Sequence, residues 1–418
     1  MRGRWLFSVL VPAAGLVYAC GSFDGAESGG GPEVPAEGGG PEAAADVAPI
    51  PDGGQGVSCA ISVFSDAPPD ARCLGPTMSP VDLASSPMHC GRCGHDCQGA
   101  SCAGGLCMPV NVFGAGTAKS ASLRDISADH AYFLSGPDVQ RVGLVSGNVD
   151  LVARTTRAGA YMQSVVRDGD QLFVTDHIDN STDIGTVPSI TASVVDGGGA
   201  ITPLLSTSGD GIVADSTHLY IVDYASLYKV KRTSNVGREA IQLNQEQTFA
   251  ILGPVSHKDV LYWIRGETIS NDGGPLTRQL FARNATTGTV LMRSDQLGAP
   301  TALAVDDTHV YFTDSSTKRI MRVLQSGTSA PTVVAEWPRN DAAVKALLVD
   351  GDYVYVVVTN DLQSGAAAVI YRAPKCAGPA DARVIVATIP GSEYAGNLLA
   401  DAKFLYYGGN NGLWRVAK

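Results

Sequence analysis

The sequence predicts an all-β chain in which residues 109–418 form a β-propeller of seven blades. A strand of alternating aromatic and aliphatic or β-branched residues occurs seven times. Its aligned aromatic residues are spaced 41 to 51 positions apart, at Tyr132, Phe173, Tyr220, Tyr262, Tyr311, Tyr355 and Tyr406. A period in the mid-forties, made of short strands and turns, is typical of one propeller blade per repeat.

The repeat at 301–335 is the clearest copy of the expected four-stranded blade. Its strands are expected at 301–305, 309–313, 319–323 and 331–335, because Asp, Ser, Thr and Gly between them favour turns. The last repeat has only three expected strands, at 397–400, 404–407 and 412–416. We expect the missing strand at 109–113, so that both ends of the propeller pair and close the ring. A six-bladed ring with one degenerate repeat is the alternative.

Residues 1–19 predict a signal peptide. Arg2 and Arg4 precede an apolar stretch, Trp5–Ala19, which is shorter than the roughly 20 residues of a membrane-spanning helix. The sequence from Leu16 to Cys20 resembles the lipobox of bacterial lipoproteins. This resemblance implies that Cys20 is acylated, becomes the mature N-terminus and holds the protein on a membrane. The alternative is an ordinary secretory signal, in which Cys20 has no such role.

Residues 20–57 are rich in Gly, Pro, Ala and Glu, which predicts a disordered tether. The lipoprotein resemblance implies a location in the bacterial cell envelope, and Gly21 after the acylated cysteine permits the outer membrane or the cell surface. Secretion is the alternative location.

Residues 58–108 predict a disulfide-rich module containing Cys59, Cys73, Cys90, Cys93, Cys97, Cys102 and Cys107. The segment from Cys90 to Cys107 resembles small cysteine-rich modules of bacterial exported proteins, which implies disulfides. Export to an oxidising compartment favours the same interpretation. The alternative is a zinc site built from Cys90 and Cys93 with His89 and His95 nearby.

The number of module cysteines is odd, and apart from Cys20 the chain has one further cysteine, Cys376. Full pairing therefore predicts a disulfide from Cys376 back to the module. The remaining connectivity cannot be read from the sequence.

Two repeats carry a recognisable phrase, from Tyr311 to Asp314 and from Phe173 to Asp176. The phrase resembles the YWTD and NHL propeller families. This resemblance implies the blade fold across residues 109–418. Those families are commonly six-bladed and include receptors, scaffolds and enzymes, so the likeness does not carry a function.

The sequence contains no P-loop, HExxH or GxSxG motif. One carboxylate follows the expected inner strand in most repeats, at Asp129, Asp168, Asp215, Asp306, Asp350 and Asp401. Their recurrence indicates turn caps, so we expect no catalytic residue, no cofactor and no metal site.

The enzymatic alternative is a metal-dependent propeller lactonase or lyase. In such families the metal lies at the mouth of the central channel, held by Glu, Asp and Asn. The corresponding positions are Ser122, Gln163, Asp210, Gly253, Thr301, Lys345 and Asn397. One carboxylate among seven is too few for a hard cation.

A formal net charge of −11 argues against a nucleic-acid partner, which needs a basic surface. We expect a non-catalytic binding or scaffold protein whose partner is an envelope protein or an extracellular ligand. We call the side with the links between strands one and two, and three and four, the first face. The second face carries the more variable links between strands two and three and between blades. Such loops concentrate binding residues, so the expected anchors are Tyr224, Arg265, Trp337, Arg339 and Tyr394.

Overall fold

The computed structural model describes residues 81–113, 121–155, 159–178, 190–195, 202–206, 211–223, 226–231, 238–241, 249–267, 278–284, 300–327, 329–337, 343–359, 368–376, 384–389, 394–409 and 412–418. The chain divides into two units, Met1–Val57 and Ser58–Lys418. The predicted signal peptide, Cys20, the tether, Cys59 and Cys73 all lie outside the described residues. Within those residues, no helix is long and apolar enough to cross a bilayer.

Five sheets in the second unit are separate antiparallel meanders, as the repeat predicts. The first holds β8–β11 (Ala160–Asp168, Gln171–Ile178, Ile190–Val195, Thr202–Ser206), and the second β12–β15 (Gly211–Ala214, His218–Asp223, Ser226–Lys231, Arg238–Ile241). The third holds β16–β18 (Phe249–His257, Val260–Glu267, Arg278–Asn284) and the fourth β19–β22 (Pro300–Val305, His309–Asp314, Arg319–Leu324, Thr332–Glu336). The fifth holds β23–β26 (Ala343–Asp350, Tyr353–Thr359, Ala368–Pro374, Val384–Ile389).

An eight-stranded sheet, ordered β3-β29-β28-β27-β4-β5-β6-β7, joins the two ends of the propeller. Its strands are β3 (Val110–Asn111), β4–β7 (Ser122–Ile126, His130–Ser135, Asp138–Gly143, Val149–Arg154) and β27–β29 (Tyr394–Ala400, Phe404–Gly409, Gly412–Ala417). Trp414 lies opposite Asn111 in the β29–β3 pair. The N–H of Val112 donates to the carbonyl of Leu413 over 2.7 Å. The predicted pairing of the two ends is therefore confirmed.

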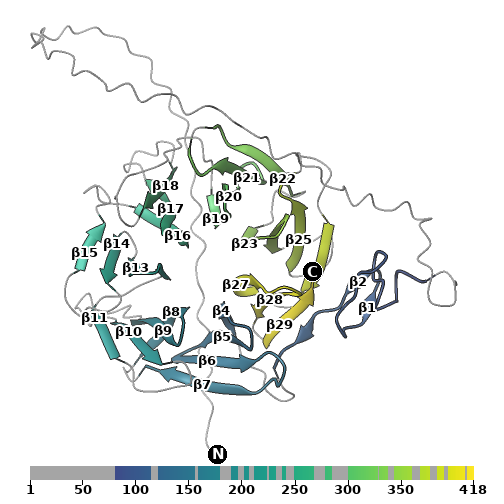
Figure 1. Ribbon diagram of the computed structural model, residues 1–418, viewed down its shortest axis with the longest axis horizontal. Coiled ribbons are helices and arrows are strands. Elements are labelled where there is room, and N and C mark those ends of the chain that lie inside the picture. Colours follow the sequence, from purple (N-terminus) through teal and green to yellow (C-terminus); the bar gives the residue numbers. More distant parts are fainter. Residues whose placement is uncertain are drawn as a thin grey trace, which may run out of the picture. The chain divides into compact units, whose positions relative to one another are not determined.

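The first strands of successive sheets surround a common centre (Figure 1). β8 contacts β12, β12 contacts β16, and the series continues through β19, β23, β27 and β4 back to β8. The all-β propeller is thus confirmed. Five blades are separate sheets. The predicted count of seven requires the eight-stranded sheet to be divided in two, which its hydrogen-bonded topology does not do.

The recurring phrase builds the core because each second strand is buried on both sides. In β17, Tyr262 and Ile264 pack with Phe312 of the next sheet, while Leu261 and Trp263 pack with the preceding sheet. Successive side chains of a strand point to opposite faces, so one phrase fills two inter-blade spaces. Each such side chain contributes about 1.5–3 kcal/mol by burial.

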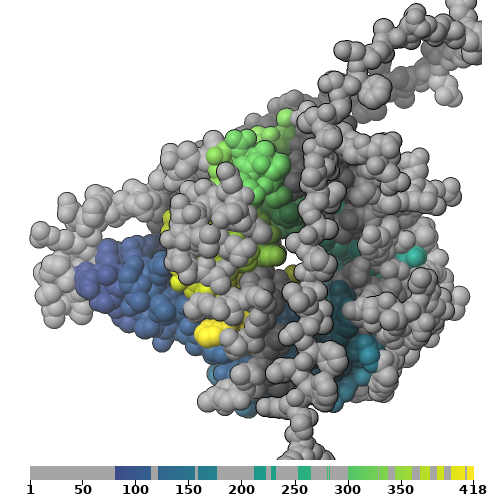
Figure 2. Space-filling model, turned by 180° about the vertical axis from the view of Figure 1, so that it is seen from behind, coloured from purple at the N-terminus to yellow at the C-terminus, as the bar shows by residue number. Residues whose placement is uncertain are grey.

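The described part of the cysteine module packs against the last blades. Its hairpin, β1 (Cys102–Ala103) and β2 (Leu106–Cys107), is held by the disulfides Cys90–Cys102 and Cys97–Cys107. These four cysteines share a buried cluster with side chains of β26 and β29. Figure 2 shows the purple and blue surface of the module against the yellow surface of the C-terminal strands.

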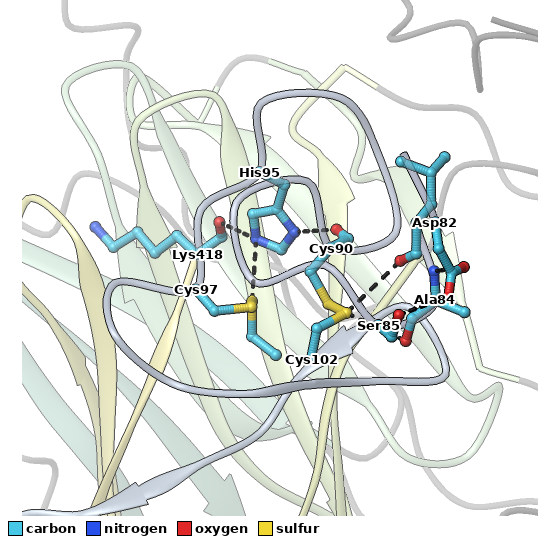
Figure 3. The surroundings of a disulfide bond; sticks show 10 residues. Asp82, Ala84, Ser85, Cys90, His95, Cys97, Cys102 and Lys418 are labelled. Carbon is cyan, nitrogen blue, oxygen red and sulfur yellow. Dashed lines mark hydrogen bonds between the residues drawn. A yellow bond between two sulfur atoms is a disulfide. The ribbon is translucent and has the colours of Figure 1, made fainter. Parts of the chain in front are cut away.

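His95 joins the module to the last residue of the sequence (Figure 3). One ring nitrogen, Nε2, lies 3.0 Å from the main-chain oxygen of Lys418, and Nδ1 lies 2.6 Å from the carbonyl oxygen of Cys90. The ammonium of Lys418 in turn contacts Asp350 and the carbonyl of Asp401. The module therefore helps to hold β29 in place.

Candidate binding site at the centre of the ring

Three of the recurrent carboxylates are turn caps, as predicted. Oδ1 of Asp306 accepts hydrogen bonds from the N–H groups of Thr308 and His309, while Oδ2 accepts one from the phenol of Tyr311 at 3.0 Å. Asp215 makes the same three contacts to residues 217, 218 and 220, and Asp401 makes them to residues 403, 404 and 406. In these three blades, the carboxylate holds the turn between the first two strands and binds the core tyrosine of the second strand.

These contacts shift the acidities of both partners. Burial alone would raise the pKa of Asp306, but hydrogen bonds from Lys375 and two backbone N–H groups outweigh it and hold the pKa well below its usual range. The pKa values of Asp215 and Asp401 are lowered for a similar reason. Burial first, and then the charge of Asp306, raise the pKa of Tyr311. Such carboxylates stay ionised near neutral pH and are poor general acids.

The first face is also occupied by contacts between blades. The Lys375 ammonium lies 2.7 Å from Asp306, and the Lys258 ammonium lies 2.8 Å from Asp307, each across a blade boundary. The hydroxyl of Ser216 donates to Asp259 at 3.0 Å. Three carboxylates in the turns of this face, Asp259, Asp306 and Asp307, therefore join neighbouring blades.

Thr313, the threonine of the recurring phrase, stabilises a bulge in the neighbouring inner strand rather than a turn. Oγ1 of Thr313, which is fully buried, accepts hydrogen bonds from the N–H groups of Thr301 at 3.3 Å and Ala302 at 3.0 Å. These two residues form a β-bulge in β19, because the pairing with β20 shifts between Pro300 and Leu303. The threonine thus satisfies backbone donors that the bulge removes from the sheet.

Bulges of this kind recur near the start of six inner strands. The register shifts in β4, β8, β16, β19, β23 and β27. The residues skipped by the pairing, which we call the central rim, are Arg124, Gln163, Gly253, Pro254, Thr301, Ala302, Lys345, Gly396 and Asn397. A bulge re-aims a side chain and is often found beside a functional site.

Five of the seven positions expected at the mouth of a channel belong to the central rim: Gln163, Gly253, Thr301, Lys345 and Asn397. Ser122 is instead a paired residue opposite Leu134, and the skipped residue of β4 is Arg124. Sequence reasoning missed Arg124 because the repeat alone does not reveal where a bulge falls. Asp210 lies outside the described residues.

The central rim lies toward the second face. In β23, Val344 is opposite Val358 and Ala343 is opposite Thr359, the last residue of β24. The bulge at Lys345 is therefore near the point where strand two ends and the link to strand three begins. Lys345, Thr301 and Asn397 are exposed, and Arg124 and Gln163 are half-buried. Among the described rim residues two are cations and none is a carboxylate.

The predicted loop anchors are not brought together by the structure. Tyr224 and Arg339 lie outside the described residues. Arg265 belongs to β17 and Tyr394 begins β27, so both are placed in strands. Trp337 is 4% exposed and packs with Val356 and Tyr371. The expectation that Trp337 is an anchor on the second face is therefore corrected, because its side chain is buried in the core.

The sulfur atoms of Cys90, Cys97 and Cys107 lie within 4.8 Å of one another, a spacing that a metal ion could use. Each of them is in a disulfide, however, and metals bind the thiolate. Cys93, the other cysteine of the zinc alternative, is disulfide-bonded as well, and so is Cys376. The oxidised module therefore offers no thiolate for zinc among the described cysteines.

No protein family and no curated protein matches this chain. Solved structures do. YCF48 from Cyanidioschyzon merolae aligns with 13% identity over 74% of this chain and 98% of its own length, with a TM-score of 0.52. A chain from the crystal structure of the mitotic checkpoint complex aligns with 12% identity over 84% and 99%, with a TM-score of 0.51. BamB from Moraxella catarrhalis aligns with 13% identity over 76% and 93%, with a TM-score of 0.48. At this identity the first two likenesses show the propeller fold alone.

Proposed function

We propose that this chain is a non-catalytic binding or scaffold protein that recognises a protein partner with its second face. One contrast carries the proposal. The recurring residues Asp215, Asp306 and Asp401 are used for turns, and Asp306 also for a contact between blades, whereas the central rim differs from blade to blade. A binding site that recognises one partner requires side chains that break the symmetry of the scaffold.

The proposal includes export and anchoring through a lipid on Cys20. Its support is the lipobox resemblance together with two disulfides in the described module, since disulfides persist outside the reducing cytosol. Mass spectrometry of the mature N-terminus should find an acylated Cys20. In a Cys20→Ala variant the protein should leave the membrane fraction.

We also propose that the eight-stranded sheet is two blades, which would make seven in all. Its two halves, β3-β29-β28-β27 and β4-β5-β6-β7, meet in parallel through a single residue pair, Gly396 and Leu123. Every other pairing between neighbouring strands of that sheet is antiparallel. One parallel pair is a contact between neighbouring blades rather than a ladder.

A covalent link from the propeller to the module completes the proposal. Cys376 is in a disulfide, and the two pairs described above use Cys90, Cys97, Cys102 and Cys107. We propose that Cys376 bonds to another module cysteine, among Cys59, Cys73 and Cys93. Peptide mapping without reduction should recover that cross-link, and a free Cys376 thiol would refute it.

A metal-dependent lactonase or lyase is the second candidate function. The described residues of the central rim provide amide, hydroxyl and cationic groups, which do not form the carboxylate-rich oxygen site of a hard divalent cation. Metal analysis of the purified protein and a lactone-hydrolysis screen would both have to be positive to favour this candidate.

The binding role is tested by co-purification from detergent-solubilised envelopes. The wild-type chain should retain a partner, a variant changed on the second face should lose it, and a variant changed on the first face should keep it. Arg265→Ala with Arg339→Ala serves as the second-face variant, and Lys403→Ala, in the first turn after β27, as the first-face control. Equal recovery with all three proteins would contradict the assignment of the recognition face.

A further inference from the structure

The central rim carries hydrogen-bond donors on consecutive inner strands. In ring order, β23 contributes Lys345, β27 contributes Asn397, β4 contributes Arg124 and β8 contributes Gln163. These four strands contact one another in that order. Lys offers three donors, Arg five, and each amide two. We call this set the donor arc.

Two members of the donor arc are held close together by the backbone. Gly396 and Leu123 are partners in a parallel pair, so Asn397 and Arg124, each the next residue along its strand, run side by side. Neighbouring strands are about 5 Å apart. The side-chain amide and the guanidinium can therefore reach the same group of a ligand.

The donor arc is positively charged, whereas the chain as a whole is negatively charged. Lys345 and Arg124 are both cationic in a protein with a formal net charge of −11. Lys345 is exposed, and among the described residues it forms no ion pair. An exposed ammonium at the centre of the ring can bind a ligand carboxylate.

The geometry points to an acidic peptide segment of a protein partner as the ligand of the donor arc. Lys345 and Arg124 bind its carboxylates. Asn397 and Gln163, each of which has an acceptor as well as donors, bind its main chain. A phosphate ion would also bind the two cations. It has no N–H groups to donate to the side-chain carbonyl oxygens of Asn397 and Gln163, however, whereas a peptide main chain does. This inference rests on the proposed binding function of the second face and names the chemistry that it recognises.

The test measures binding of a fluorescent Glu-rich peptide to the full mature chain by anisotropy. The same peptide with Gln in place of Glu is the neutral probe, and inorganic phosphate is the competitor. We expect the Glu peptide to bind and the Gln peptide to bind at least about tenfold more weakly, because paired interfacial charges contribute strongly. Affinity should fall as the ionic strength rises.

Lys345→Gln should weaken peptide binding by about five- to tenfold and Lys345→Glu by more, because a like charge then faces the peptide. Lys231→Gln is the matched control: Lys231 is an exposed lysine at the end of β14, and its loss should change affinity less than about twofold. Arg124→Gln should act like Lys345→Gln, and circular dichroism of each variant checks that the fold is retained.

Equal binding of the Glu and Gln peptides, or equal affinity of the wild type and Lys345→Gln, would overturn the inference. Displacement by phosphate together with failure to bind the peptide would overturn it as well. If no acidic peptide binds while the envelope partner is still retained through the second face, this inference fails and the proposed function stands. If neither binds, both fail.

Discussion

The ammonium of Lys375 lies 2.7 Å from Oδ2 of Asp306, in the preceding blade, and both side chains are mostly buried. Lys375 follows the third strand of one blade, and Asp306 follows the first strand of the other. The guanidinium of Arg322 also donates to the carbonyl of Lys375. A turn cap in one blade therefore also fixes the position of the next blade.

Asp306→Asn should lower the free energy of unfolding by about 1–3 kcal/mol, because it weakens several hydrogen bonds and leaves Lys375 without its charge partner. Asp307→Asn is the matched control, since this neighbouring residue is exposed and its pairs with Lys258 and His257 should contribute under about 1 kcal/mol. Denaturant unfolding of both variants measures the difference. Equal effects would show that the buried contacts of Asp306 add nothing.

The stability contribution of Asp306 should disappear in acid. Its folded-state pKa is depressed, so its contribution is fully present above the unfolded value of about 4 and is lost as the pH falls through the folded value. The difference in unfolding free energy between the wild type and Asp306→Asn should therefore be large at neutral pH and shrink toward about pH 2. A difference that stays constant over this range would contradict the ionised role of Asp306.

Thr313→Val should lower the free energy of unfolding by about 1–3 kcal/mol. Two N–H groups of the β19 bulge then lose the buried hydroxyl that accepts their hydrogen bonds. Thr332→Val, on the exposed start of β22, is the control and should change stability by less than about 0.5 kcal/mol, because the hydrogen bond that its hydroxyl accepts from Arg322 is exposed to solvent. Thermal or denaturant unfolding distinguishes them. If Thr313→Val is as mild as the control, the threonine is not what holds the bulge.

Loss of the Cys97–Cys107 disulfide should loosen the ring closure as well as the module. This bond spans ten residues of sequence, and its removal should cost about 2–4 kcal/mol. In Cys97→Ser with Cys107→Ser, amide hydrogen exchange should accelerate in β29, against which the module packs, but not in β14 on a distant blade. Unchanged exchange in β29 would show that the module does not support the closure.

The sequence was sufficient to predict the strands. Those expected at 301–305, 309–313 and 319–323 are found at Pro300–Val305, His309–Asp314 and Arg319–Leu324. Alternation of period two, bounded by turn residues, determines where a strand runs. The pairing of the two chain ends was predictable for a related reason, since an incomplete last repeat requires a strand from elsewhere.

The candidate site was only partly predictable. The bulge at Arg124 depends on pairing with β5, which a single strand does not encode. Trp337 follows a predicted strand and precedes a proline, which suggested a loop. Its backbone N–H instead donates to the carbonyl of Lys318, and its ring extends the core between two sheets. Tertiary packing decided both cases, and local pattern does not report it.

The central claim is that the recurring residues build the ring and the residues that differ between blades recognise the partner. The most direct measurement compares Asp306→Asn with Lys345→Gln in both unfolding free energy and affinity for the Glu-rich peptide. We predict that Asp306→Asn loses stability while its folded form keeps the affinity, and that Lys345→Gln keeps stability and loses affinity. The reverse pattern, or the loss of both properties in both variants, would contradict the claim.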